Sequence, residues 1–188
     1  MFQATFPYPG PLDPEAVHRW VEKLMGGRAA NHYIYAAEQA SPIYTAISVR
    51  TAVVPSPLKD LATPVPTFNP GETLYFSLTA TAEKRVGSGP RQPLPPGDLA
   101  ARRAWLDRRA EMHGFVVTEA TTTTLPPLRI RKEDGGRPFA LDRTRFTGLL
   151  TVADRDAFAT ALLNGVGRGR AYGNGFLFVD PVEPRRTT

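Results

Sequence analysis

The segment from Asn164 to Gly175, NGVGRGRAYGNG, carries residue types that suit the binding of an anion. Five glycines fall within eleven residues, and Arg168 and Arg170 stand between them. Glycine lets a backbone approach a ligand closely and adopt positive φ, and clustered backbone N–H groups form a nest for an anion. The segment therefore predicts a phosphate-binding loop. Its candidate contacts are Gly165, Gly167, Arg168, Gly169, Arg170, Gly173 and Gly175.

Two common phosphate-binding motifs do not describe this loop. A Rossmann fingerprint needs a strand, then the glycines, then a helix, whereas this segment follows an expected helix at 154–164 and precedes an expected strand at 176–179. The Gly-Lys-Ser/Thr sequence of a P-loop is also missing from it. These differences argue against dinucleotide binding. A flexible turn that binds no ligand remains an alternative.

The positive charge of the chain lies in its second half. Residues 1–81 hold five Lys or Arg and six Asp or Glu, whereas residues 82–188 hold 18 and 12. A basic half suggests a polyanionic partner, nucleic acid first. Nineteen of the 23 cations are arginine, which suits bidentate phosphate contacts, although a GC-rich genome would favour arginine as well.

The composition excludes several kinds of site. The chain has no cysteine, so disulfides, thiolate metal sites, thiol nucleophiles and iron–sulfur clusters are ruled out. The carboxylates are scattered, and no metal site is predicted. Apolar residues make up 41% of the chain, which is enough for a packed core. No run of about 18 apolar residues could span a membrane, the N-terminal residues lack the layout of a signal peptide, and a cytoplasmic location is expected.

The first half of the chain has the element order of a split βαβ unit. An apolar stripe at Val17, Trp20, Val21 and Leu24 predicts a helix that begins at Pro14 after an Asp13 cap. A weak helix is expected around 57–61. Alternation of apolar and polar residues predicts four strands, at 1–8, 32–37, 43–50 and 72–80.

The second half repeats this order. Helices are expected at 98–113 and at 154–164, and residues 83–97 are too rich in proline, glycine and cations to form an element. The expected strands are 115–124, 128–132, 138–141, 145–152 and 176–179, with an EDGG turn at 133–136. We therefore expect an α+β protein of two tandem ferredoxin-like domains, 1–82 and 98–188, joined by a linker at 83–97.

Several stretches together resemble one known family. The segment GVGRGRAYGNGFLFV is similar to the C-terminal glycine-rich loop of the CRISPR repeat-RNA processing proteins, and its lead-in is similar to their type I-E branch, CasE. The resemblance spans nearly the whole chain. The other stretches that agree in order and spacing are DPEAVHR (13–19), GETLYFSLTA (71–80), AWL (104–106) and FTGLLTV (146–152).

The resemblance implies an endoribonuclease that cuts precursor CRISPR RNA at each repeat hairpin and stays bound to the product in the Cascade complex. The implied chemistry needs no metal and no other cofactor. The upstream 2′-hydroxyl attacks in line and leaves a 2′,3′-cyclic phosphate and a 5′-hydroxyl. The implied partners are the repeat stem-loop and the other Cascade subunits. Two alternatives stay open: a non-catalytic repeat-RNA-binding subunit of the same fold, and a glycine-loop RNA-binding protein outside CRISPR systems.

The resemblance makes His18 the catalytic residue. It lies at the border of the polar and apolar faces of the first expected helix, and an imidazole can donate or accept a proton near neutral pH. Arg19, Lys23 and Arg28 lie on or just after that helix and could stabilise charge on the reacting phosphate. Relatives often carry tyrosine three positions before the histidine, whereas this chain has Glu15, whose carboxylate would repel a phosphate.

Further cations are expected to grip the RNA. Four of them lie on the arms of the EDGG hairpin and resemble the family's basic hairpin, which enters the groove of the RNA stem: Arg129, Arg131, Lys132 and Arg137. The expected helix at 98–113 carries four arginines that could track phosphates, or that could simply be solvated. They are Arg102, Arg103, Arg108 and Arg109.

Overall fold

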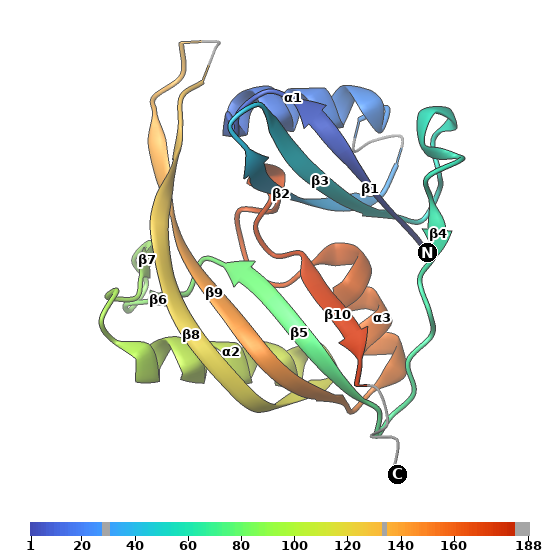
Figure 1. The fold of residues 1–188 in the computed structure, drawn as a ribbon. Coiled ribbons are helices and arrows are strands. Elements are labelled where there is room, and N and C mark those ends of the chain that lie inside the picture. Colours follow the sequence, from blue (N-terminus) through green and yellow to red (C-terminus); the bar gives the residue numbers. More distant parts are fainter. Residues whose placement is uncertain (28–30, 133–134, 183–188) are drawn as a thin grey trace.

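The computed structural model describes residues 1–27, 31–132 and 135–182. Within these ranges the strands form two four-stranded antiparallel sheets and one two-stranded hairpin. Figure 1 shows α1 above the first sheet, α2 below the second, and the glycine-rich loop in orange between the two sheets. The α+β class with two ferredoxin-like units is confirmed.

The first sheet has the strand order β2-β3-β1-β4, which is the ferredoxin-like order. A short 3-10 helix, η1, takes the place of the second helix of that fold. Its elements are β1 (Phe2–Pro9), α1 (Pro14–Leu24), β2 (Tyr33–Ser41), β3 (Tyr44–Thr51), η1 (Ser56–Leu58) and β4 (Thr63–Pro64).

The second sheet has the order β10-β5-β9-β8, the same arrangement again. Its elements are β5 (Thr73–Ala80), α2 (Leu99–Met112), β8 (Phe115–Ile130), β9 (Phe139–Val152), α3 (Arg155–Asn164) and β10 (Leu177–Pro181). A second short 3-10 helix, η2 (Arg170–Tyr172), lies inside the glycine-rich loop.

The strand expected at 72–80 does not complete the first sheet, so that prediction is wrong. It is β5, and it lies between β10 and β9, where Leu78 pairs with Leu177 on one side and Phe146 on the other. Its inward residues join the core of the second sheet, and the two-residue β4 completes the first. The chain therefore passes from one sheet to the other between β4 and β5, not at residue 82.

The segment expected to be a linker at 83–97 also differs from the prediction. It forms a hairpin of β6 (Glu83–Arg85) and β7 (Arg91–Pro93), and Leu94 is buried in the second core. The fully buried Arg102 fastens it, because its guanidinium donates to the carbonyls of Leu94 and Pro95 and pairs with Asp142 at 3.1 Å. Arg102 is therefore a structural cation and cannot track phosphates, contrary to the expectation.

The strands expected at 115–124 and 128–132 merge into β8, and those at 138–141 and 145–152 merge into β9. The result is one long hairpin. In Figure 1 it rises from the second sheet past the edge of the first sheet, so that its outer end stands beside α1. This hairpin is what carries residues of the second unit to the helix of the first.

Helix α1 forms where local signals place it. The Asp13 carboxylate accepts hydrogen bonds from the backbone N–H groups of Glu15 and Ala16, and Pro14 occupies the first turn. Val17 and Val21 are buried against the first sheet. The helix is thereby held in one rotation, which fixes the direction of the other side chains that it carries.

Buried Arg50 of β3 joins the two units. Its guanidinium donates to the carbonyls of Leu162 in α3 and Leu177 in β10, at 3.0 and 3.1 Å, and lies 4.4 Å from the Phe176 ring centroid. Burial lowers the pKa of Arg50 to about 10, so it remains a cation at neutral pH. The contact fixes the first sheet against the segment that follows the glycine-rich loop.

Candidate active site and nucleic-acid interface

The glycine-rich loop is held by hydrogen bonds within itself and to both sheets. Val166 N–H donates to the Gly175 carbonyl at 2.8 Å, Gly175 N–H donates to Thr79 of β5 at 2.7 Å, and the Tyr35 hydroxyl of β2 donates to the Ala171 carbonyl at 2.6 Å. The loop therefore contacts both sheets. These bonds favour one conformation of the loop over the flexible turn of the alternative interpretation.

Packing explains part of the glycine pattern. Gly165 has a φ of +75°, and a Cβ there would lie 2.0 Å from Ile34 Cδ1 and 2.8 Å from the Gly175 carbonyl oxygen. A Cβ at Gly167 would press on the Trp105 ring at 3.2 Å, and one at Gly169 would press on Asn174 at 3.0 Å. The small size of these residues is thus required by the protein itself, and phosphate binding by the loop stays a prediction.

The loop places Tyr172 against the candidate catalytic histidine. The ring centroids of Tyr172 and His18 are 5.3 Å apart, and the Tyr172 hydroxyl donates to Glu15 Oε2 at 3.3 Å. Phe139 at the start of β9 also packs edge-on against the Tyr172 ring, at 5.6 Å. Tyr172 was not among the predicted site residues, although it lies within the glycine-rich loop that was predicted to bind phosphate.

The hairpin brings Lys132 to the same place. Its Nζ lies 3.2 and 3.3 Å from the two carboxylate oxygens of Glu15 and 5.3 Å from the centroid of the Tyr172 ring. Hydrogen bonding, with Tyr172 first and Glu15 second in size of effect, raises the pKa of Lys132, so its ammonium group stays protonated at neutral pH. Lys132 was expected on the RNA stem together with its neighbours. In the structure its ammonium faces Glu15 and Tyr172, and its contact with RNA stays a prediction.

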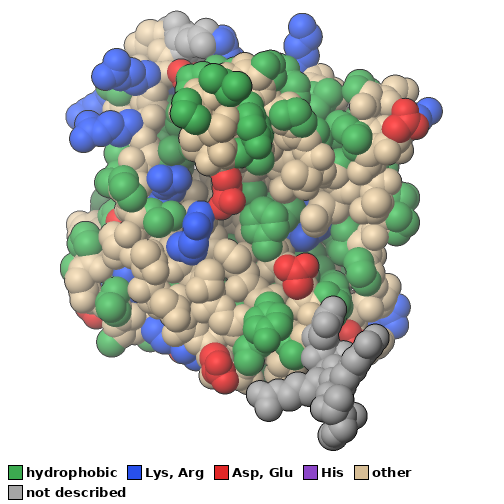
Figure 2. Space-filling view, in the orientation of Figure 1, with side chains coloured by type: hydrophobic (Ala, Val, Ile, Leu, Met, Phe, Trp, Pro, Cys, Tyr) green, Lys and Arg blue, Asp and Glu red, His purple; other side chains and the backbone are tan. Residues whose placement is uncertain are grey.

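Strand alternation explains why the Lys132 side chain points to the opposite side of the hairpin from Arg129 and Arg131. Leu128 and Ile130 are buried, so the next residue in step with them, Lys132, turns to the same side of the hairpin, toward α1. Arg129 and Arg131 are exposed on the other side, and Arg137 on the returning arm is exposed as well. Figure 2 shows Lys and Arg side chains gathered at the upper left, over the outer end of this hairpin.

His18 is held in a partly open position on α1. Its side chain is 16% exposed, and its Nε2 lies 3.8 Å from Glu22 Oε2, one helical turn further on. The carboxylate of Glu15, which was expected to repel a phosphate, faces Lys132 and Tyr172, so a cation offsets its charge.

The other predicted cations of this region are more scattered. Arg19 and Lys23 are exposed on α1, about 100° and 140° around the helix from His18. Arg28 lies outside the described residues. In the loop, Arg170 donates to the Asn164 carbonyl at 2.8 Å, and Arg168, whose side chain is 62% exposed, lies 3.4 Å from Glu83. The structure therefore brings Lys132 to the side of Tyr172, the ring that packs against His18, and the roles of Arg19 and Lys23 stay predictions.

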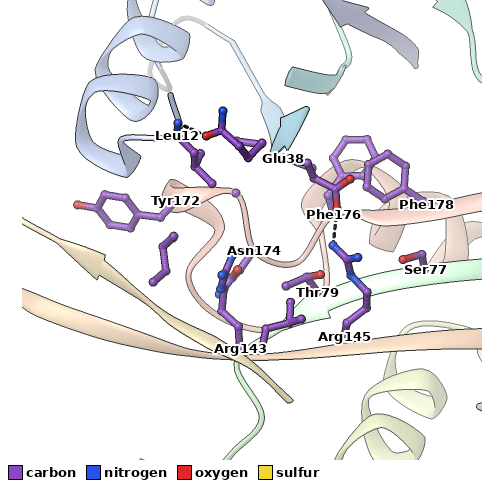
Figure 3. Close-up of a pocket in the computed structure, with 16 residues that line it drawn as sticks. Leu12, Glu38, Ser77, Thr79, Arg143, Arg145, Tyr172, Asn174, Phe176 and Phe178 are labelled. Carbon is purple, nitrogen blue, oxygen red and sulfur yellow. Dashed lines mark hydrogen bonds and ion pairs between the residues drawn. The ribbon is translucent and has the colours of Figure 1, made fainter. Parts of the chain in front are cut away.

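A cleft of about 330 Å³ adjoins Tyr172 and separates the open faces of the two sheets. Figure 3 shows Arg143 and Arg145 of β9 and Asn174 of the loop around it, with Arg145 paired to Glu38 of β2 at 2.6 Å. Burial, with a contribution from Arg145, lowers the pKa of Arg143. Neither arginine was predicted as a site residue. Their alternation along one strand shows that they share a face of it, but not that this face lines a cleft between the two sheets.

Neither a metal centre nor a membrane segment emerges from the described residues. Among them, no three or more His, Cys, Asp or Glu side chains gather so as to hold a metal ion. No helix in the described ranges is long and apolar enough to cross a membrane.

Comparison with known proteins finds CRISPR proteins. A family model described as CRISPR associated protein matches residues 10–181. The CRISPR-associated endoribonuclease Cse3 of Thermus thermophilus is 34% identical over 127 residues, which are 62% of this chain and 59% of that relative. The match thus spans less than two thirds of the relative's length.

Solved structures agree over the whole fold. A structure of the CRISPR endoribonuclease Cse3 bound to 19 nt RNA has a TM-score of 0.77 at 27% identity, covering 96% of this chain and 100% of that one. Cas6e from Escherichia coli K-12 has a TM-score of 0.75 at 20% identity, covering 97% and 100%, and shows the same fold.

Proposed function

Because the chain belongs to the CRISPR-associated protein family, we propose that it is an endoribonuclease that cleaves precursor CRISPR RNA within the repeat hairpin. After cleavage it would remain bound to the product, in the cytoplasm, as a subunit of Cascade. The similar Cse3 is named an endoribonuclease and has been solved with RNA. The observation that carries the proposal is that Tyr172 packs against His18, with ring centroids 5.3 Å apart, and that the Lys132 ammonium lies 5.3 Å from the same tyrosine ring.

The proposed reaction needs proton transfer and no metal. The 2′-oxygen attacks the scissile phosphorus, the bond from phosphorus to the 5′-oxygen breaks, and the products are a 2′,3′-cyclic phosphate and a 5′-hydroxyl. One proton leaves the 2′-hydroxyl and one reaches the departing 5′-oxygen. His18 is the group suited to move one of these protons near neutral pH, and its partial exposure lets RNA reach it.

Charge on the reacting phosphate needs cations close by. In the proposed site Lys132 supplies one of them, since its ammonium group lies 5.3 Å from the ring centroid of Tyr172, which packs against His18. Arg19 and Lys23 on α1 remain proposed contributors to the same charge. The stem would lie along the exposed Arg129, Arg131 and Arg137, and its phosphates would reach the loop at Arg168.

The test is cleavage of a labelled repeat hairpin in the presence of EDTA. The wild-type protein should cut within the repeat, and the 5′ product should end in a cyclic phosphate. His18→Ala should lower the cleavage rate by at least about 10²-fold and leave RNA binding nearly intact. His113→Ala, at the end of α2, is the matched histidine control and should cleave like wild type.

The outcome separates the candidate functions. Tight repeat binding by a wild-type protein that does not cleave would support the alternative of a non-catalytic repeat-RNA-binding subunit. Cleavage by His18→Ala at the wild-type rate would remove His18 from the mechanism.

A further inference from the structure

Glu15 has an unusual environment for a residue in the first turn of a helix. It is only 7% exposed, and both carboxylate oxygens are engaged: Lys132 Nζ lies 3.3 Å from Oε1 and 3.2 Å from Oε2, and the Tyr172 hydroxyl donates to Oε2 at 3.3 Å. A buried carboxylate is unfavourable unless it is paired and hydrogen-bonded in this way. Glu15 therefore ties together α1, the outer end of the β8–β9 hairpin, and η2.

Stabilising the helix does not require this arrangement. An acidic residue in a first turn interacts favourably with the helix dipole even when it faces water, and Asp13 already caps α1. Instead, the carboxylate faces Tyr172, whose ring packs on His18, and Lys132, which lies beside that ring. The Tyr172 ring packs on the imidazole at 5.3 Å, and Lys132 lies 5.3 Å from the Tyr172 ring.

A lysine at the end of a strand would otherwise sample many rotamers in solvent, because its ammonium sits on a flexible four-carbon stem. Held by Glu15, that ammonium occupies one place before any RNA arrives. Preorganised charge stabilises a reacting phosphate without rearrangement during the reaction. The carboxylate also lowers the net positive charge that Lys132 presents to the phosphate, so the arrangement favours the chemical step at the expense of affinity.

We propose that Glu15 is a positioning residue of the active site, which holds the Lys132 ammonium and the Tyr172 hydroxyl beside His18. The inference rests on the proposed endoribonuclease function. Glu15 takes no part in bond breaking. It acts through Lys132 and Tyr172.

The first test separates the cleavage rate from RNA affinity. Glu15→Gln keeps the size of the side chain and an oxygen that can accept from Tyr172, but it loses the charge that holds Lys132. The single-turnover rate constant at saturating protein should fall by about 10-fold to 10²-fold. The Kd for the repeat hairpin should stay the same or tighten, because a negative charge has been removed.

Glu119→Gln is the matched control. It removes the same charge from an exposed position on β8 and should leave the rate unchanged. Glu15→Ala, with its fold checked by thermal melting, should behave like Glu15→Gln or be slower. A Glu15→Gln protein that cleaves as fast as wild type, or faster, overturns the proposal.

A double-mutant cycle tests whether Glu15 acts through Lys132. If it does, adding Glu15→Gln to Lys132→Met should cause little further loss of rate, because the group being positioned is already gone. If the two losses multiply, Glu15 does not work through Lys132 and the proposed role is wrong.

A third readout needs no RNA. The chain has only four lysines, so trace labelling of amines followed by peptide mass spectrometry can follow Lys132 against the exposed Lys59 and Lys84. Lys132 should label slowly in the wild type and several-fold faster in Glu15→Gln. Unchanged labelling, in a protein whose wild type cleaves the hairpin, overturns the positioning role alone. A wild type that does not cleave overturns the proposed function, and the positioning role with it.

Discussion

Replacing Gly165 with alanine tests whether the glycine-rich loop is built by packing. A non-glycine residue at its φ of +75° is disfavoured by about 1–2 kcal/mol. The added methyl would also lie 2.0 Å from Ile34 Cδ1, whose side chain is 1% exposed, and 2.8 Å from the Gly175 carbonyl oxygen. Overpacking of this kind adds about 1–3 kcal/mol. Gly165→Ala should therefore lower the free energy of unfolding by about 2–5 kcal/mol.

The assay is urea unfolding, with Gly71→Ala as the matched control. Gly71 has a φ of +90°, but a Cβ there would meet nothing within 4 Å, so only the strain of about 1–2 kcal/mol applies. Because the Gly165 methyl points into the protein, the RNA affinity of the folded variant should change much less than its stability. If the two variants were equally stable and only Gly165→Ala lost RNA binding, the packing argument would be refuted. Gly165 would then be a phosphate contact of the loop.

Two further predictions concern the arginines. Removing Arg129, Arg131 and Arg137 together should weaken binding of the RNA hairpin. In a salt titration, the slope of log K against log salt should become shallower by somewhat less than one unit for each lost phosphate contact. An unchanged slope would mean that RNA docks elsewhere. Arg102→Ala should destabilise the fold by about 3–5 kcal/mol, because it leaves Asp142 without its buried partner. Its neighbour Arg103→Ala, which breaks an exposed pair with Asp107 and a hydrogen bond to the Val117 carbonyl, should cost about 1–2 kcal/mol in the same unfolding assay.

The elements of the fold follow largely from local signals. The Asp13 cap, the proline after it and the apolar stripe predict α1, and alternation predicts the strands of both sheets except the two-residue β4. These signals act between residues a few positions apart, so the sequence displays them directly. They are also sufficient for the α+β class and the ferredoxin-like order of elements.

The sequence did not show in the same way which other strands or side chains each element packs against. The alternation of 72–80 shows that one face is buried, but the same pattern fits either sheet, and only the pairing of Leu78 with Phe146 and Leu177 decides between them. Arg102 and Arg103 are adjacent arginines on one helix. The carboxylate of Asp142 on β9 draws one of them into the core, and no signal near either residue indicates which.

The candidate site shows the same division. The sequence by itself determined that His18 stands on a capped helix, and that a basic hairpin and a glycine-rich loop exist. Only the tertiary structure decided that Lys132 and Tyr172, 117 and 157 positions from Glu15, would meet its carboxylate beside that histidine. The physical reason is that a helix or a turn forms from contacts along the chain, whereas this cluster depends on the length of the β8–β9 hairpin and on the bonds that fix the loop between the two sheets.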